Sequence, residues 1–177
     1  MQPLKFVGSV DQGTTSTRFI IWDRSGVAVA CAQLEHSQIL PKPGHVEHDA
    51  AEIWQRTEDV ITRALASAGL SGCDLAAIGI ANQRETTVAW DAVTGEPLHN
   101  ALVWQDTRTQ AIIDSLSADQ ASLLQKRTGL KATTYFSASK MKVPPPSRSL
   151  SRRPQPMFSK KSFAVAAAAA QRRFGAA

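Results

Sequence analysis

The stretch SVDQGTTSTR, residues 9–18, places an acid, a glycine, a row of four small hydroxyl residues (14–17) and an arginine between two apolar runs. Gly13 tolerates a positive φ angle, and the flanking runs 6–10 and 19–22 are rich in residues that favour strands. These features alone predict an ordinary hairpin turn. An ordinary turn, however, requires neither Asp11 nor a row of hydroxyls nor an arginine.

The alternative is a hairpin turn that binds phosphate. Backbone N–H groups at a glycine turn form an anion-binding concavity, hydroxyls add donors, and Arg18 adds a charge-assisted one. Asp11, at the end of the first strand, can hold Mg²⁺ through water, because Mg²⁺ keeps several waters and takes one or two carboxylates. The sequence contains no GxxxxGK[ST] P-loop. The candidate phosphate-binding residues are Asp11, Gln12, Gly13, Thr14, Thr15, Ser16 and Arg18.

The composition is that of an ordinary globular protein, with 177 residues of which 43% are hydrophobic, and it predicts one domain. No signal-peptide pattern opens the chain, and the apolar run 163–170 is far shorter than the roughly 20 residues that span a bilayer. These features predict a cytoplasmic protein without a membrane segment. Cys31 and Cys73 match no metal-ligand spacing, so we expect reduced structural thiols.

Charge divides the chain into two parts. All 15 acidic residues lie within residues 1–119, whereas residues 120–177 contain no acid and 12 of the 20 lysines and arginines. Residues 143–177 are dominated by Pro, Ser, Arg and Ala, and we expect this basic tail to be disordered, because it cannot bury enough apolar surface. Its composition is also what a shifted reading frame in GC-rich DNA would encode.

The hydrophobic pattern predicts alternating strands and helices. Residues 5–11, 16–23 and 27–38 read as a three-stranded antiparallel meander. A helix is expected to begin at Asp49, with Glu52 completing a capping box, and to run with a 3.6-residue period to a C-terminal cap at Gly69. The apolar run that follows is typical of a strand buried on both faces. The further elements expected are this strand at 74–82, two short strands at 86–91 and 101–105, and helices at 106–117 and 118–129.

This order of elements resembles the nucleotide-binding lobe of the actin, hexokinase and sugar-kinase superfamily. The resemblance implies an α/β fold: an incomplete N-terminal lobe, ribonuclease H-like, with a mixed sheet and flanking helices. In that superfamily the turn after the first strand is the first phosphate loop. The resemblance therefore implies ATP and Mg²⁺ as the ligands of residues 9–18.

Four segments make the resemblance more specific: PKPGHVEHDAAEIW at 41–54, ANQRETTVAWD at 81–91, NALVWQDTRT at 100–109 and YFSASKMK at 135–142. They resemble the signature segments of the glycerol kinases within the FGGY family of carbohydrate kinases, in the same order and with similar spacing. The resemblance implies that residues 1–142 are part of an FGGY N-terminal domain and that the tail, 143–177, is unrelated to it.

The same resemblance implies ATP-dependent phosphorylation of glycerol to glycerol 3-phosphate. Arg84 and Glu85 match residues that bind glycerol hydroxyls, Tyr135 matches a further hydrogen-bonding residue, and Trp104 matches a tryptophan that packs on the carbon chain. Without the resemblance, a surface ion pair is the alternative reading of Arg84 and Glu85, and Trp104 and Tyr135 are more often core or edge aromatics. The three histidines of the N-terminal third are expected to be structural or solvated: His36, His45 and His48.

The family's general base lies in a later Gly-Asp-Gln segment that this sequence does not contain. We therefore expect the 177-residue chain itself to be inactive, as a truncated or frameshifted product. The competing hypotheses are a non-catalytic interaction protein whose basic tail binds nucleic acid, and a solitary phosphate-binding hairpin. Nucleic-acid binding is not expected, because no recognised motif accompanies the arginines. The full-length family also implies a possible homo-oligomer.

Overall fold

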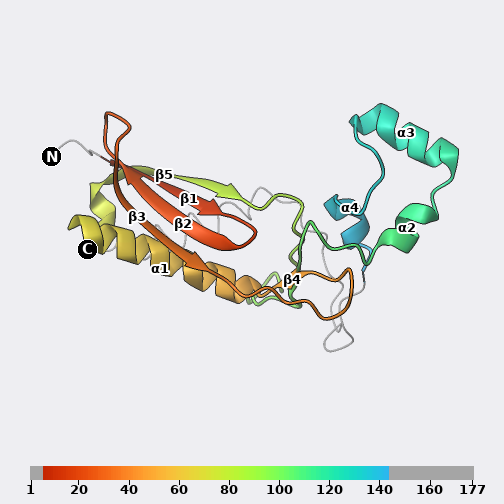
Figure 1. Cartoon of the computed structure of the whole chain (residues 1–177), viewed down its shortest axis with the longest axis horizontal. Helices are drawn as coiled ribbons and strands as arrows, with labels where there is room; N and C mark the ends of the chain where they lie inside the picture. The colour runs from red at the N-terminus through yellow and green to blue at the C-terminus, as the bar shows by residue number, and fades with distance from the viewer. Residues whose placement is uncertain (1–5, 144–177) are drawn as a thin grey trace. The chain divides into compact units, whose positions relative to one another are not determined.

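The computed structural model of the chain describes residues 6–143, and the tail prediction therefore falls, apart from Val143, outside the described residues. The described residues divide into two compact units, 6–36 with 52–82 and 37–51 with 83–143. Figure 1 shows a sheet with one long helix in the first unit and short helices in the second. None of the helices within 6–143 is long and apolar enough to cross a bilayer.

The first unit is built on a four-stranded mixed sheet. β1 (Phe6–Gln12) pairs antiparallel with β2 (Ser16–Trp22), and β2 pairs antiparallel with β3 (Ala28–Glu35). β5 (Leu75–Asn82) pairs parallel with β1, which gives the order β3-β2-β1-β5. The meander and the α/β fold class are confirmed.

Helix α1 (Ala50–Ala68) covers one face of this sheet (Figure 1). Its 3.6-residue apolar period is the predicted one, and it ends at Gly69, whose φ of 63° is the left-handed conformation expected of a C-terminal cap. Asp49 accepts the N–H of Ala51 at 2.8 Å at the start of the helix. The core between helix and sheet consists of Val10, Phe19, Ile21, Val60, Ile61, Ala64 and Leu65.

The prediction that 74–82 is buried on both faces is wrong for the described residues. A short 3₁₀ helix, Gly72–Asp74, leads into β5, where only Leu75 and Ile80 pack against the core and the other side chains are largely exposed. Among the described strands β5 is an outer one that pairs only with β1, and it contributes only Leu75 and Ile80 to the border of the core. The apolar run therefore predicts the strand correctly but predicts its burial wrongly.

Gly8 of β1 is required by the ring of Phe19, which is fully buried. A Cβ atom added at Gly8 would lie 2.4 Å from Phe19 Cζ and 2.8 Å from Cε2. We expect Gly8→Ala to destabilise the first unit by about 1–3 kcal/mol, the usual cost of overpacking a core. Urea denaturation, followed by amide exchange in β1 and β2, measures this loss.

The matched control is Gly79→Ala in β5, because a Cβ atom there meets nothing within 4 Å. Replacing a strand glycine by alanine at an open position should be neutral or stabilise by about 0.5–1 kcal/mol. Equal losses from the two substitutions would contradict the assignment of Gly8 as a packing glycine.

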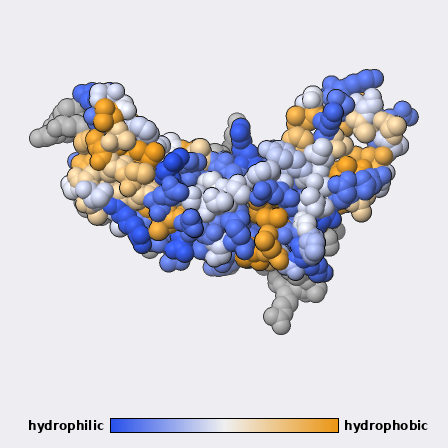
Figure 2. Space-filling model, viewed as in Figure 1, coloured by the Kyte–Doolittle hydropathy of each residue, from blue (hydrophilic) through white to orange (hydrophobic). Residues whose placement is uncertain are grey.

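The second unit contains little regular structure. β4 (Glu47–His48) pairs antiparallel with β6 (Ala101–Leu102), and three helices follow: α2 (Gln110–Asp114), α3 (Ala118–Thr128) and α4 (Ser137–Lys140). α3 ends at Gly129 as predicted, with φ 75°. It has no buried residue, and Leu123 and Leu124 are exposed on it; hydrophobic surface is visible in this region in Figure 2.

Three expected elements of this unit are shorter than predicted. The strand 86–91 is reduced to isolated bridges from Thr87 and Trp90, and the partner of Trp90 is Pro97, which has no N–H to extend a ladder. The strand 101–105 stops after Leu102, because Val103 and Asp106 form a turn. The helix 106–117 retains only Gln110–Asp114. Before it, Asp106 and Arg108 bond to Val46 and Glu47.

Candidate active site

The turn after β1 is a tight glycine hairpin in the first unit. The N–H of Gly13 donates to the carbonyl of Ser16 at 2.9 Å, and a Cβ atom at Gly13 would approach that same carbonyl to 3.2 Å. His36, which is buried and directly follows β3, holds the turn: its Nε2 lies 2.9 Å from the carbonyl of Thr14, and its backbone N–H donates to the carbonyl of Thr15. Here His36 is structural, as predicted.

Side chains at the ends of β1 and β2 leave the sheet on opposite faces. Asp11 and Arg18 are cross-strand partners on one face and form an exposed ion pair, with Nη2 and Oδ2 2.9 Å apart. Gln12 lies on the other face, where its Nε2 donates to Thr57 Oγ1 of α1 at 2.8 Å. Gln12 thus ties the hairpin to the helix, and its part in phosphate binding stays a prediction.

The chemistry of this turn fits a phosphate and a magnesium ion. Asp11 is a single exposed carboxylate at the carboxyl end of β1, beside the guanidinium of Arg18. Within residues 6–143, no three His, Cys, Asp or Glu side chains gather as a metal site. A Mg²⁺ ion held mainly by waters and phosphate oxygens needs only one such carboxylate. Asp11 would hold that ion, while the turn would contact the phosphate.

In the second unit, Glu85 is held in a fixed position. Its φ of 67° is the only positive φ of a non-glycine residue among those described, and such strain occurs most often at functional sites. Its Oε2 accepts hydrogen bonds from the N–H of Ser137 at 2.8 Å and from the hydroxyl of Ser137 at 2.7 Å. Arg84, by contrast, is exposed, and within the described chain its side chain makes no hydrogen bond or ion pair.

An aromatic cluster lies in the same unit. The rings of Trp104 and Tyr135 have centroids 5.4 Å apart and are tilted by 59°, and Tyr135 meets Phe136 edge-on at 5.1 Å. Tyr135 is 45% exposed, so it can still meet a ligand. The two aromatic residues singled out from the sequence are therefore in contact, although they come from separate segments.

The main chain of Trp104 is anchored on both sides. Its N–H donates to Thr86 Oγ1 at 3.3 Å, and its carbonyl accepts from Lys140 Nζ at 3.5 Å. Thr86 donates in turn to Gln83 Oε1, and the Gln83 amide lies 3.3 Å from Nδ1 of the buried His48. His48 is structural here, as predicted.

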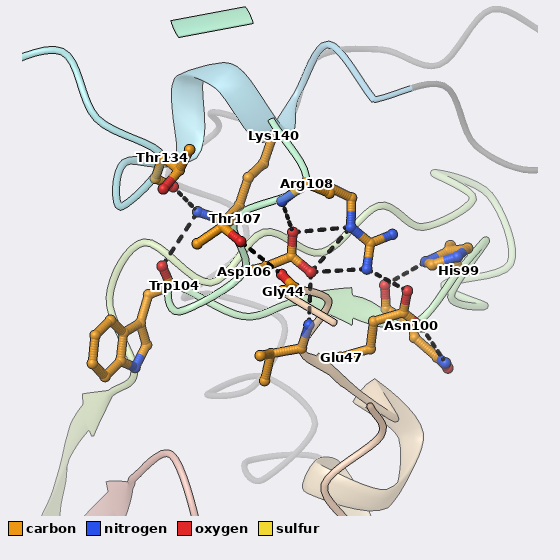
Figure 3. A network of polar contacts seen from close by, with 11 residues as sticks. Gly44, Glu47, His99, Asn100, Trp104, Asp106, Thr107, Arg108, Thr134 and Lys140 are labelled. Carbon is orange, nitrogen blue, oxygen red and sulfur yellow. Dashed lines mark hydrogen bonds and ion pairs between the residues drawn. The ribbon is translucent and has the colours of Figure 1, made fainter. Parts of the chain in front are cut away.

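Behind these residues is a buried ionic network, drawn in Figure 3. Arg108 bonds to Asp106 through Nε and Nη2, at 2.8 to 3.0 Å, and to Glu47 Oε1 at 2.6 Å. Asp106 also accepts the N–H of Val46, and Glu47 accepts the amide of Asn100. The network joins β4 to the segment that carries Trp104.

The network sets the ionisation of its members. Burial acts most strongly and would raise the pKa of Asp106, but hydrogen bonds from Arg108 and Val46 outweigh it and hold that pKa below 3.8. Burial likewise opposes ionisation of Glu47, yet Asn100 and Arg108 lower its pKa below 4.5. The pKa of Arg108 is raised, since its two carboxylate partners outweigh burial. All three groups are charged at neutral pH.

Comparison with known proteins decides the family. The family model described as "FGGY family of carbohydrate kinases, N-terminal domain" matches residues 6–142. The chain belongs to the FGGY family of carbohydrate kinases. The FGGY match includes both units and every candidate residue named above.

Curated relatives of this FGGY chain are glycerol kinases. It is 58% identical over 137 residues to glycerol kinase 1 of Streptomyces coelicolor, and 57% identical over 139 residues to the glycerol kinase of Pseudarthrobacter chlorophenolicus. The aligned part covers 77% and 78% of this chain, respectively. It covers only 27% and 28% of the two relatives, so the chain matches little more than a quarter of their length.

Solved structures agree with the sequence relatives. Plasmodium falciparum glycerol kinase with ADP superposes with a TM-score of 0.71 at 36% identity, over 78% of this chain and 28% of that one. A ligand-bound xylulose kinase from Lactobacillus acidophilus gives 0.67 at 25% identity, over 75% and 26%. The fold is thus that of the sugar kinases, and the higher identity is to the glycerol kinase.

The candidate residues fall into two sets. The phosphate set, Asp11 to Arg18, lies wholly in the first unit, and the glycerol set, Arg84, Glu85, Trp104 and Tyr135, lies wholly in the second. Sequence reasoning missed the residues that hold these sets in place. Only contacts between distant segments identify them: Thr57, Thr86, Ser137 and Lys140.

Proposed function

We propose that residues 6–142 provide the acceptor-binding residues and the first phosphate loop of a glycerol kinase. This enzyme transfers the γ-phosphoryl group of ATP to a terminal hydroxyl of glycerol. The observation that carries the proposal is the geometry around Glu85. Ser137 fixes the carboxylate, while Trp104 and Tyr135 form an aromatic pair in the same unit.

Binding of glycerol needs hydrogen bonds to its hydroxyls and apolar packing against its carbons. Glu85 would accept hydrogen bonds from glycerol hydroxyls, and Arg84, whose guanidinium is unengaged within the described chain, would donate to them. Trp104 would pack against the three carbons, and the Tyr135 hydroxyl would add a further hydrogen bond. A hydrogen bond to a charged group is worth about 1.5–3 kcal/mol, so a few such contacts are sufficient to select a small polyol.

The hairpin turn would act on the phosphate. Mg²⁺, when bound, neutralises charge on the phosphate oxygens. Asp11 would hold this ion through water, and Arg18 would exchange its contact with Asp11 for a phosphate oxygen. Thr14 to Ser16 would offer N–H and hydroxyl donors from a turn that His36 keeps closed, while the N–H of Gly13 stays bonded to the carbonyl of Ser16. By the FGGY resemblance, the general base and the adenosine site lie in later segments of the full-length kinases, and the segment with the base is not in this sequence. We place the reaction in the cytoplasm, where ATP is available.

The experiment is a chimaera in which residues 6–142 replace the matching segment of Streptomyces coelicolor glycerol kinase 1. Release of ADP is followed with ATP and Mg²⁺, in the presence and absence of glycerol. The proposal requires glycerol-dependent release that Asp11→Ala abolishes. A folded chimaera that releases no ADP with glycerol, or the same amount without it, would show that these residues do not form the site.

A further inference from the structure

Lys140 is a buried charged residue to which the proposed reaction gives no role. It ends α4, is 1% exposed, and within residues 6–143 forms no ion pair. Burial lowers the pKa of its ammonium, against the opposing charges of Asp106 and Glu85. A buried ammonium is expensive unless each of its protons has an acceptor. Its position therefore requires an explanation.

The ammonium of Lys140 donates its hydrogen bonds to main-chain carbonyls of the proposed glycerol site, which we call the acceptor site (Arg84, Glu85, Trp104 and Tyr135). It donates to the carbonyls of Thr134, of Tyr135 at 3.2 Å, and of Trp104 at 3.5 Å. An ammonium has three donors, so the three carbonyls match its full capacity. Figure 3 shows the side chain of Lys140 reaching between Thr134 and Trp104.

These carbonyls belong to the two segments that carry the aromatic pair. Trp104 follows β6, whereas Tyr135 precedes α4, and their rings touch at a centroid distance of 5.4 Å. Lys140 thus bonds to the backbone of both residues at once. Ser137, on the same short helix, holds Glu85. The helix α4 therefore joins all three of Glu85, Trp104 and Tyr135.

We propose that Lys140 is a positioning residue of the acceptor site, whose ammonium fixes the main chain of Trp104 and Tyr135 and so sets the spacing of the two rings. This inference rests on the proposed function only for the identity of the ligand, a small polyol. A compact ammonium suits three converging carbonyls better than the planar fork of an arginine, so arginine should restore the geometry only in part.

The test uses the intact 177-residue chain labelled with 5-fluorotryptophan. Its four tryptophans give four ¹⁹F signals, and loss of one signal in Trp104→Phe assigns the reporter. In Lys140→Met without ligand, we expect the Trp104 signal to shift or broaden while Trp22, Trp54 and Trp90 keep their positions. Lys140→Arg should bring the Trp104 signal part of the way back.

A glycerol titration supplies the second readout. The midpoint of the Trp104 shift should rise roughly 10-fold in Lys140→Met, since a small misplacement of a binding group has effects of this order. If the wild-type chain does not respond to glycerol, the proposed function fails at this site. The ligand-free spectra still decide the role of Lys140 in that case.

Two results would overturn the proposal: an unchanged Trp104 signal in Lys140→Met, or equal displacement of all four signals. If Lys140→Met unfolds the second unit, Trp90 will move together with Trp104. In that case Lys140→Gln, whose side-chain amide still donates hydrogen bonds, distinguishes a positioning role from general stabilisation of the fold. The proposal requires the glutamine variant to displace Trp104 alone, and displacement of Trp90 as well would reduce Lys140 to a general stabiliser of the fold.

Discussion

Arg108→Met should destabilise the second unit by about 3–5 kcal/mol, because it leaves two buried carboxylates without their shared counter-charge. Asp106 is fully buried and Glu47 is 5% exposed, and both bond to the one guanidinium. The N–H of Val103, bonded to the carbonyl of Val46, reports on opening of this region. Its protection against hydrogen exchange should fall by about 10² to 10⁴-fold.

The control is Arg63→Met, an exposed arginine of α1 whose loss should change exchange in the second unit little. Equal effects of the two substitutions would contradict the assignment of the network as a structural element. A loss confined to the first unit would contradict it as well.

At acidic pH, the difference in stability of the second unit between the wild type and Arg108→Met should become smaller. In the wild type the pKa values of Glu47 and Asp106 are lowered from 4.5 and 3.8, so the stability they contribute is complete above those values and is lost as the pH falls through the lower folded ones. In the variant, the unpaired carboxylates become protonated more readily. The exchange difference at Val103 should therefore be large at pH 7, begin to shrink where the carboxylates of the variant take up protons, and be smallest below the lowered pKa values of the wild type.

Glu85→Ala should lower kcat/KM for glycerol in the chimaera by about 10² to 10³-fold, while KM for ATP changes little. The substitution removes a charged acceptor and leaves the donors of the polyol and of Ser137 unsatisfied. It keeps the strained φ of 67°, so any relief of backbone strain does not confuse the result. Steady-state kinetics with each substrate varied in turn give both constants.

The matched variant is Ser137→Ala, which removes the hydroxyl donor but keeps the N–H bond to Glu85. It should lower kcat/KM for glycerol by a smaller factor, about 10-fold, and should again leave KM for ATP nearly unchanged. Equal effects of Glu85→Ala on both substrates would count against a role in acceptor binding. So would a Ser137→Ala effect larger than that of Glu85→Ala.

Local signals in the sequence predicted the first unit well. Gly13 between two β-rich runs predicts the hairpin, and the 3.6-residue period with Gly69 predicts α1, because each signal acts over a few neighbouring residues. The exposure of β5 was not predictable in this way. An apolar run reports that a strand can be buried, whereas its position at the outside of the sheet depends on which strands pair with it.

The second unit was predicted less well, because its geometry depends on contacts between distant segments. Asp106 and Arg108 are typical of a helix start, yet they bond to Val46 and Glu47, some 60 residues earlier in the chain. The side chain of Glu85, whose backbone is strained, accepts hydrogen bonds from Ser137, 52 residues later. Resemblance to the kinase segments identified Glu85, Trp104 and Tyr135 as candidates. No pattern in the sequence predicts that residues of α4 bond to all three.

The most direct measurement is the choice of acceptor by the chimaera. Its kcat/KM for glycerol and for xylulose, the substrate in the name of the Lactobacillus acidophilus neighbour, should be compared at saturating ATP and Mg²⁺. We expect glycerol to be favoured by about 10⁴-fold, since a wrongly seated acceptor would leave the polar groups of the site unpaired. Equal use of the two acceptors, or a preference for xylulose, would contradict the assignment of these residues to a glycerol site.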